Sequence, residues 1–214
     1  MHTRLLAATI LASLPLAAAA QDRIVPSYGF ALTSDYMSKG QTQSDHNPAL
    51  QGYAEASYGL FYGGLWASTV DFDTADSFEF DIYAGVRPSF GGANFDISYL
   101  RYLYDNSGDC CGEFKFDVAY PIDDIGLVGA YFAYDNILDT KWLEARAEYY
   151  FADVWYSSVD IGNDFGSLDL GSDRMTAYDV GFGRALGDIG KVDLRFYDSN
   201  YTSGRGVVTI SADF

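Results

Sequence analysis

The C-terminal segment 207–214 alternates side chains on a period of two and ends on an aromatic residue. Successive side chains of a β-strand point to opposite faces, so this period predicts a strand with two chemically different faces. One face carries Val208, Ile210, Ala212 and Phe214; the other carries Val207, Thr209, Ser211 and Asp213. A helix would need a period near 3.6, and this segment does not have one.

The same alternation recurs along the rest of the chain. In 77–87, the side chains of Phe78, Phe80 and Ile82 share one face, while Glu79 and Asp81 lie on the other. Segments between turn signals predict about twelve strands, each near the ~9–11 residues of a tilted membrane strand. We place them near 25–36, 49–58, 61–71, 77–87, 92–104, 112–121, 125–134, 141–151, 154–163, 174–185, 189–198 and 205–214.

The connections between these strands alternate between tight and long. The tight set is 58–61, 87–93, 121–125, 152–153 and 186–190, and the longer, more polar set is 37–48, 72–76, 105–111, 135–140, 164–173 and 200–204. Short turns on one side and longer loops on the other are typical of outer-membrane barrels. We therefore expect an all-β fold, a transmembrane up-and-down antiparallel β-barrel of about twelve strands.

A soluble sandwich or lipocalin-like barrel is the alternative, because its half-buried strands also alternate. The two differ in which face points outward: a membrane barrel turns apolar residues to lipid and polar ones to the lumen. Aromatic residues cluster at strand ends, which favours the membrane barrel because they suit membrane interfaces. The clusters are Tyr58, Phe61 and Tyr62, and Tyr149, Tyr150, Phe151, Trp155 and Tyr156.

Both ends of the chain predict export. Residues 1–20 have the basic, apolar and Ala-rich regions of a cleaved secretory signal peptide, with Arg4 in the basic part. We expect a Sec-type signal, a barrel domain over 21–214 and a place in the bacterial outer membrane. A terminal strand ending in Phe214 is typical of the signal that barrel-assembly machinery reads. Outer-membrane lipid and lipopolysaccharide are then further partners.

Composition excludes other classes. The chain has 13 basic and 30 acidic residues, a net charge of −17, which argues against binding nucleic acid because its phosphates require Lys and Arg. With 49% hydrophobic and 17% aromatic residues, the composition is not that of a disordered chain.

The segment 30–85 resembles a known family. It contains Ser34-Asp-Tyr-Met-Ser-Lys-Gly-Gln-Thr-Gln-Ser44, then Asn47-Pro-Ala-Leu-Gln-Gly52, then Gly59-Leu-Phe-Tyr-Gly-Gly-Leu-Trp-Ala-Ser-Thr-Val-Asp-Phe72, and finally Glu79-Phe-Asp-Ile-Tyr-Ala-Gly85. These strings are similar to the TorF family of proteobacterial exported porins, formerly of unknown function. Lys39 and Thr69 depart from the Arg and Asn expected there. The resemblance implies an outer-membrane barrel and a porin, and it implies no particular substrate.

Catalysis is not expected. His46 is the only histidine outside the signal segment, and it falls in a predicted loop. A nucleophile needs a base held within hydrogen-bond reach, and a zinc site needs three or four ligands. We therefore predict no enzyme activity, no metal site at His46 and no cofactor.

Cys110 and Cys111 are adjacent, and we place them in a predicted long loop. An oxidising compartment favours disulfides. Three states are open: a vicinal disulfide, an intermolecular bond or two free thiols.

Acidic residues are also frequent in the predicted loops and could bind hard divalent cations, although ordinary solvation is the favoured explanation. They are Asp71, Asp73, Asp76, Asp105, Asp109, Asp160, Asp164, Asp169 and Asp173.

Counting by twos predicts which charged side chains line the lumen. They are Glu79, Asp81, Asp96, Lys115, Asp117, Glu144, Arg146, Glu148, Asp179, Asp193 and Arg195, together with Arg184 and Asp213. Arg101 has outward parity, which suits a position near the rim or a bulge. Acidic linings favour cations.

We expect a porin that passes small hydrophilic solutes or ions by passive diffusion, with a mild cation preference. The alternative is a non-conducting barrel whose acidic loops act in adhesion, as a receptor or as a scaffold. Nothing in the sequence marks a subunit interface.

Overall fold

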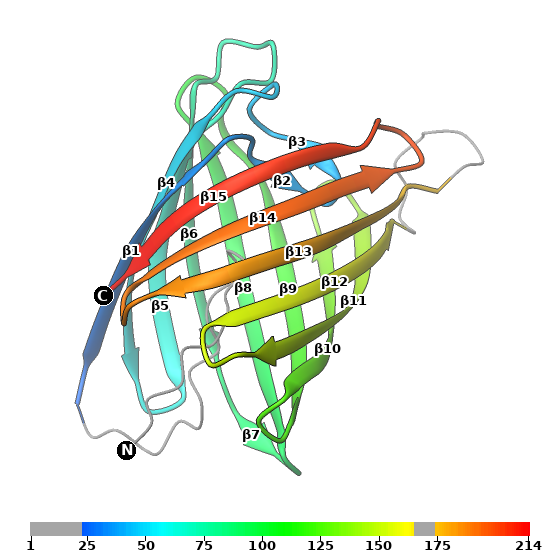
Figure 1. The fold of residues 1–214 in the computed structure, drawn as a ribbon. Coiled ribbons are helices and arrows are strands. Elements are labelled where there is room, and N and C mark those ends of the chain that lie inside the picture. Colours follow the sequence, from blue (N-terminus) through cyan, green and yellow to red (C-terminus); the bar gives the residue numbers. More distant parts are fainter. Residues whose placement is uncertain (1–22, 165–173) are drawn as a thin grey trace.

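The computed structural model describes residues 23–164 and 174–214, which form a closed β-barrel (Figure 1). Twelve long strands build its wall. They are β1 (Val25–Thr33), β4 (Ala49–Tyr58), β5 (Phe61–Thr69), β6 (Phe78–Val86), β8 (Ala93–Tyr104), β9 (Gly108–Ile122), β10 (Gly126–Asp135), β11 (Thr140–Phe151), β12 (Trp155–Asp164), β13 (Thr176–Leu186), β14 (Gly190–Ser199) and β15 (Arg205–Asp213).

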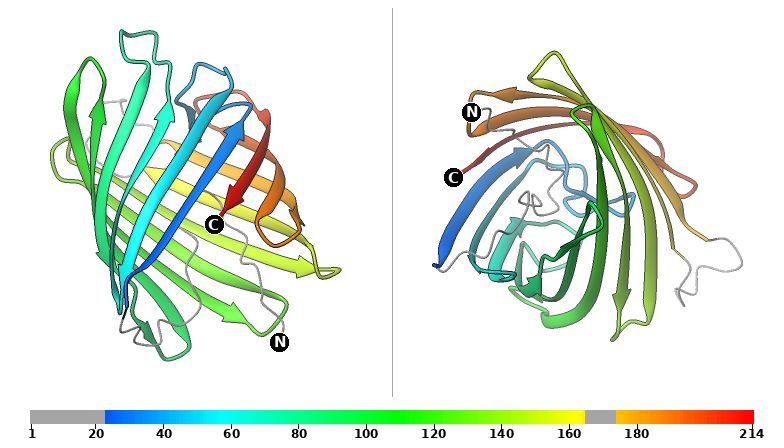
Figure 2. Two further views of the ribbon diagram at one scale, coloured as in Figure 1. Left: turned by 90° about the vertical axis from the view of Figure 1, so that its left-hand side faces the viewer. Right: turned by 90° about the horizontal axis from the view of Figure 1, so that it is seen from below.

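Each long strand pairs antiparallel with the long strand before and after it, and β1 pairs with β15 to close the ring. The prediction of a twelve-stranded up-and-down barrel is thus confirmed. At one end of the barrel lie tight turns; we call it the short-turn end. The longer connections lie at the other, which we call the long-loop end (Figures 1 and 2).

Three short strands lie outside this wall. β2 (Met37–Ser38) and β3 (Gln41–Thr42) form a hairpin in the connection between β1 and β4, and β7 (Ser89–Phe90) pairs with the start of β8. Most predicted strand limits differ from the observed ones by one or two residues. Two differ more: β1 ends at Thr33 rather than at residue 36, and β9 begins at Gly108 rather than at residue 112.

The two faces of the barrel have opposite chemistry. Side chains that alternate outward are apolar and exposed, as for Phe30, Ile82 and Leu194, whereas Glu79 and Arg195 point inward and are almost fully buried. A water-soluble barrel places apolar side chains inside. The observed arrangement is the reverse, as in barrels that face lipid.

Aromatic residues at the strand ends divide between these faces. Tyr58, Phe61, Tyr149 and Phe151 are exposed or half-exposed on the outer face at the short-turn end. The expectation that Tyr62, Tyr150 and Tyr156 belong with them was wrong. They have the opposite parity, point inward and donate hydrogen bonds to Asp96, Glu148 and Asp193 respectively.

Phe214 lies at the seam that closes the barrel. Its backbone exchanges hydrogen bonds with Tyr28 in both directions, and the two rings stack with centroids 5.1 Å apart. The aromatic terminus therefore extends the pairing of β15 with β1. Within the part of the chain that the structure describes, no helix is long and apolar enough to cross a membrane.

Candidate functional site: the barrel lumen

The inward face of the strands carries a charged network, and most of the predicted lumen residues belong to it. The side chains at the inward parity include Glu79, Asp81, Asp96, Lys115, Asp117, Glu144, Arg146, Glu148, Asp179, Asp193, Arg195 and Asp213. Arg184 does not belong to it, because its even number places it on the same face as Tyr178 and Phe182. Its side chain faces outward, with the guanidinium 5.1 Å from the Trp155 ring centroid.

Arg195 on β14 is the centre of the most connected cluster. Its guanidinium forms ion pairs with Asp160 at 2.9 Å, with Asp193 at 3.3 Å and with Asp179, and it donates a hydrogen bond to Ser158. Gly181 is its register partner on β13, and a Cβ at that position would overlap the guanidinium. The cluster depends on a glycine that lets the arginine lie flat across the sheet.

Asp160 is not a loop residue, so the prediction that it belongs to an acidic loop is wrong. It lies in the middle of β12, where Val159 and Ile161 face outward, and the residue is 6% exposed. Charge and parity together therefore identify it as a lumen residue. The sequence carried this signal, since Asp160 alternates with two β-branched residues.

The neighbouring wall carries a second guanidinium–carboxylate pair. Arg146 on β11 forms a bidentate interaction with Asp117 on β9, reaching across β10 at Gly129. Glu144 accepts a hydrogen bond from the indole of Trp142 at 3.0 Å. Glu148 accepts one from Tyr150 at 2.9 Å.

A third cluster lies toward the short-turn end. Arg87, which directly follows β6, pairs with Glu55 on β4 and with Asp96 on β8 at 2.9 Å, and it stacks 3.6 Å from the Tyr62 ring centroid. Sequence reasoning found Asp96 but did not include Arg87 and Glu55 among the lumen residues. Arg87 shares the parity of Glu79 and Asp81 at the end of the predicted strand 77–87, so the sequence carried the signal for it.

The connection between β1 and β4 enters the long-loop end of the barrel. Lys39, at the tip of the β2–β3 hairpin, forms an ion pair with Glu113 on β9, and Gln41 contacts Met175, which precedes β13. β9 and β13 lie on opposite sides of β1 in the ring, so the hairpin spans the lumen between two walls.

Gly40 allows this close approach. Its φ is +77°, a left-handed conformation that favours glycine, and a Cβ there would overlap that of Ala177 on β13. The hydroxyl of Thr202 donates to its carbonyl at 3.3 Å.

Asp35 fixes the base of the same loop. Its carboxylate contacts His46 Nδ1 at 2.8 Å and Arg205 at 2.6 Å, and accepts a hydrogen bond from Thr42 at 2.6 Å. His46 is therefore paired with a carboxylate at the loop base, although its ring is about half exposed. Within residues 23–164 and 174–214, no three His, Cys, Asp or Glu side chains converge on a metal site.

The space left between these groups is small. A cavity of about 40 Å³, enough for a few water molecules, lies beneath the hairpin tip. Lys39, Trp142, Glu144, Asp160, Asp179 and Tyr197 line it. This cavity in the lumen is therefore small and polar.

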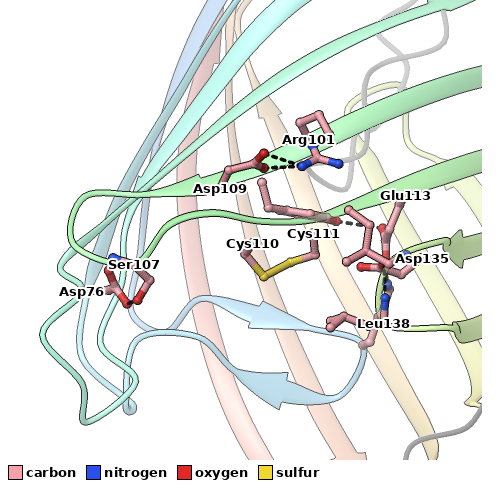
Figure 3. The surroundings of a disulfide bond; sticks show 12 residues. Asp76, Arg101, Ser107, Asp109, Cys110, Cys111, Glu113, Asp135 and Leu138 are labelled. Carbon is pink, nitrogen blue, oxygen red and sulfur yellow. Dashed lines mark hydrogen bonds and ion pairs between the residues drawn. A yellow bond between two sulfur atoms is a disulfide. The ribbon is translucent and has the colours of Figure 1, made fainter.

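Cys110 and Cys111 form a vicinal disulfide, and they lie in β9 rather than in a loop (Figure 3). The loop placement was wrong because β9 continues four residues beyond the predicted strand. Tyr102 pairs with Cys111 and Leu103 with Asp109, so Cys110 is the extra residue of a β-bulge.

This bulge sets the direction of Asp109. With a regular ladder Asp109 would point into the lumen; with one extra residue it lies on the outer face together with Arg101, and the two form an ion pair (Figure 3). Arg101 faces outward, as its parity predicts, and a β-bulge lies in the neighbouring strand β9. The sequence alone could not locate the bulge.

The loops at the long-loop end also hold carboxylates in defined roles. Asp76 accepts hydrogen bonds from the amide and hydroxyl of Ser107, which lower the pKa of its carboxyl (Figure 3). Asp105 accepts bonds from the amide and hydroxyl of Ser77, which lower its pKa as well. These residues join the β5–β6 loop to the β8–β9 turn. Asp169 and Asp173 lie outside the described residues.

The fold is similar to those of solved outer-membrane proteins. The KdgM porin, solved in complex with disordered oligogalacturonate, superposes with a TM-score of 0.64 at 9% identity, over 88% of this chain and 99% of that one. A structure from a study of in-meso crystallization of membrane proteins superposes with a TM-score of 0.60 at 11% identity, over 88% of this chain and 83% of that one. An outer-membrane channel from Pseudomonas putida F1 superposes with a TM-score of 0.50 at 11% identity, over 89% of this chain and 94% of that one.

Architecture and inside-out faces together define a membrane-type β-barrel whose fold is similar to those of outer-membrane porins and channels. Residues 17–206 match the Gcw_chp family, described as bacterial proteins of unknown function. The chain belongs to this family. A comparison with curated protein sequences gives no match.

Proposed function

We propose that this protein is an outer-membrane porin that passes small hydrophilic solutes or ions by passive diffusion. The observation that supports this most directly is the polar, charged inner face of a closed barrel whose outer face is apolar. The small cavity beneath the β2–β3 hairpin restricts the proposed solutes to small ones.

A mild preference for cations is part of the proposal, because acidic linings favour cations. Inward carboxylates outnumber inward cations among the described strands, and several have no guanidinium partner. Glu144 and Glu148 are examples, since their hydrogen-bond donors are Trp142 and Tyr150. They leave negative charge facing the lumen on the wall that also lines the cavity.

The remaining assignments belong to the same proposal. Residues 1–20 act as a cleaved secretory signal, 21–214 form the barrel, and the long-loop end faces the cell exterior next to lipopolysaccharide. Phe214 is then part of the signal for the barrel-assembly machinery, and the family includes the TorF-type porins that 30–85 resembles. We propose no catalytic step and no cofactor.

Single-channel conductance of the refolded protein in a planar bilayer, with the reversal potential under a salt gradient, tests the proposal. We expect discrete, cation-selective steps. The Glu144→Gln/Glu148→Gln variant removes two lumen charges without breaking an ion pair to arginine, so its reversal potential should move toward zero. The matched variant Asp123→Asn/Asp153→Asn removes two charges from exposed turns and should keep the reversal potential of the parent protein.

The small size of this cavity favours one other function. If the β2–β3 hairpin and the ion pairs close the barrel, the protein is a non-conducting barrel that acts through its long, acidic loops. A protein that shows the heat-dependent gel mobility of a folded barrel but carries no current would support that alternative and overturn the porin proposal.

A further inference from the structure

Glu79 and Asp81 occupy successive inward positions on β6 and form what we call the carboxylate pair. The residues are 2% and 4% exposed. Each has one buried carboxylate oxygen, Glu79 Oε2 and Asp81 Oδ1, without a hydrogen-bond partner. Leaving a buried charged acceptor unsatisfied is costly, so such atoms require an explanation.

The carboxylate pair differs from the other acidic clusters in the lumen. Those around Arg87, Arg146 and Arg195 are matched by guanidinium groups. Two lysines in this part of the lumen interact with Glu113 instead: Lys39 forms an ion pair with it, and the Lys115 Nζ lies 3.7 Å from its Oε2. Within the described residues, neither member of the pair forms an ion pair within 4 Å.

Gln51 adds a third oxygen on the same part of the wall. It pairs in register with Ser68 on β5, and Ser68 pairs with Glu79, so the three inward side chains form one row across β4, β5 and β6. Ser68 is fully buried and donates its hydroxyl to the Thr69 carbonyl. Gln51 Oε1 is itself buried without a partner in a residue that is 4% exposed.

Aromatic side chains surround this patch. Tyr104 is the register partner of Glu79, while Trp66 and Tyr102 flank Asp81 on the two adjacent strands. Tyr36, from the β1–β4 connection, packs on Trp66 with ring centroids 5.5 Å apart. Aromatic rings therefore border the carboxylate pair on both neighbouring strands.

We propose that Glu79, Asp81 and the Gln51 carbonyl bind a hard metal cation of the Ca²⁺ type in the wall of the lumen. Carboxylate and amide oxygens are the ligands that Ca²⁺ prefers, and it takes six to eight oxygens, so waters complete the shell. Two carboxylates match the charge of a divalent ion. The inference goes beyond passive diffusion, because binding is measurable whether or not the barrel conducts.

Terbium luminescence tests the site directly. Tb³⁺ binds where Ca²⁺ binds, and it emits when a nearby tryptophan or tyrosine is excited. The full barrel, refolded in lipid vesicles, should show sensitised Tb³⁺ emission that Ca²⁺ displaces. The Glu79→Gln/Asp81→Asn variant should fall to the emission of protein-free vesicles, and Trp66→Phe should lower the emission.

A matched variant distinguishes the lumen from the neighbouring loop. Asp71→Asn/Asp73→Asn removes two exposed carboxylates from the β5–β6 loop, next to the start of β6, and should keep the emission and its displacement by Ca²⁺. Folding of every variant is checked by heat-dependent gel mobility, and the single variants Glu79→Gln and Asp81→Asn serve if the double variant does not fold.

Two outcomes would overturn the site. Loss of emission in the loop variant, with retention in the lumen variants, would place the ion in the loop. Absence of displaceable emission from the folded parent protein would mean that the carboxylate pair does not hold a cation. Neither outcome depends on conductance, so the porin proposal is tested separately.

Discussion

Arg195 illustrates how single residues hold the interior of this barrel together. Its side chain is 4% exposed and balances Asp160, Asp179 and Asp193 on three strands. Removing one partner of a buried ionic cluster is more harmful than replacing the whole cluster, because the remaining charges stay buried without compensation.

The Arg195→Met variant should therefore lose about 3 kcal/mol in the free energy of unfolding. The measurement is a urea titration of the barrel folded in lipid bilayers. Adding Asp160→Asn and Asp179→Asn to the same variant removes two of the orphaned charges and should restore most of the loss. If the triple variant is no more stable than Arg195→Met alone, the ionic explanation is wrong.

Gly40 supports a prediction about close approach. An alanine at a left-handed φ costs about 1 kcal/mol, and at position 40 the new methyl would also overlap Ala177. Gly108 has a similar φ of +74°, but a Cβ there has no neighbour within 4 Å. Gly40→Ala should thus destabilise the seated hairpin more than Gly108→Ala destabilises its turn.

Limited proteolysis of the β1–β4 connection measures this difference. Faster cleavage within 37–42 is expected for Gly40→Ala, and parent-like cleavage for Gly108→Ala. Equal rates in the two variants would show that the hairpin tip does not depend on contact with β13.

At the scale of elements, the bulge in β9 decides which way the end of that strand points. The extra residue is Cys110, and beyond it Asp109 pairs with Leu103 on the outer face. Deleting Cys110 would leave a regular ladder in which Cys111 still faces inward and Asp109 still faces outward. Deleting a residue from a regular part of the strand turns every side chain on one side of the deletion to the opposite face of the sheet.

The variant that lacks Cys110 and carries Cys111→Ser should therefore fold, with a free energy of unfolding within about 1 kcal/mol of the Cys110→Ser/Cys111→Ser protein. A variant that lacks Phe116 should not give the folded, heat-modifiable species, because its charged lumen residues would turn toward lipid. Failure of the Cys110 deletion, with normal folding of the double serine protein, would contradict the bulge.

The elements also show what the sequence could and could not predict. The period of two located all twelve long strands and turned Glu79, Asp117 and Arg146 inward. It could not show that Lys39 reaches Glu113, since that contact joins residues 74 positions apart and depends on the closed ring. The bulge at Cys110 was also beyond reach, because one extra residue leaves no periodic trace when the strand continues for only a few residues.

At the scale of the whole molecule, the outer face consists of exposed apolar side chains from every long strand. In water such a surface would drive association, whereas in a bilayer it is the favoured surface. Val159 is at the centre of β12, between Ala147 and Val180, and is 46% exposed. Leu186 has the same exposure but ends β13 at the short-turn end.

These two positions test whether lipid covers the outer face. Val159→Arg should cost about 2–4 kcal/mol in bilayers and Leu186→Arg only ~0–1 kcal/mol, because the penalty for a lipid-facing charge falls from the midplane to the interface. Urea titrations of both variants in the same vesicles measure the difference. On a face exposed to water, the two substitutions would cost equally little. A small cost at both positions would therefore reject the membrane barrel itself, and with it the porin proposal, while a cost confined to Val159 would place the bilayer midplane at the centre of β12.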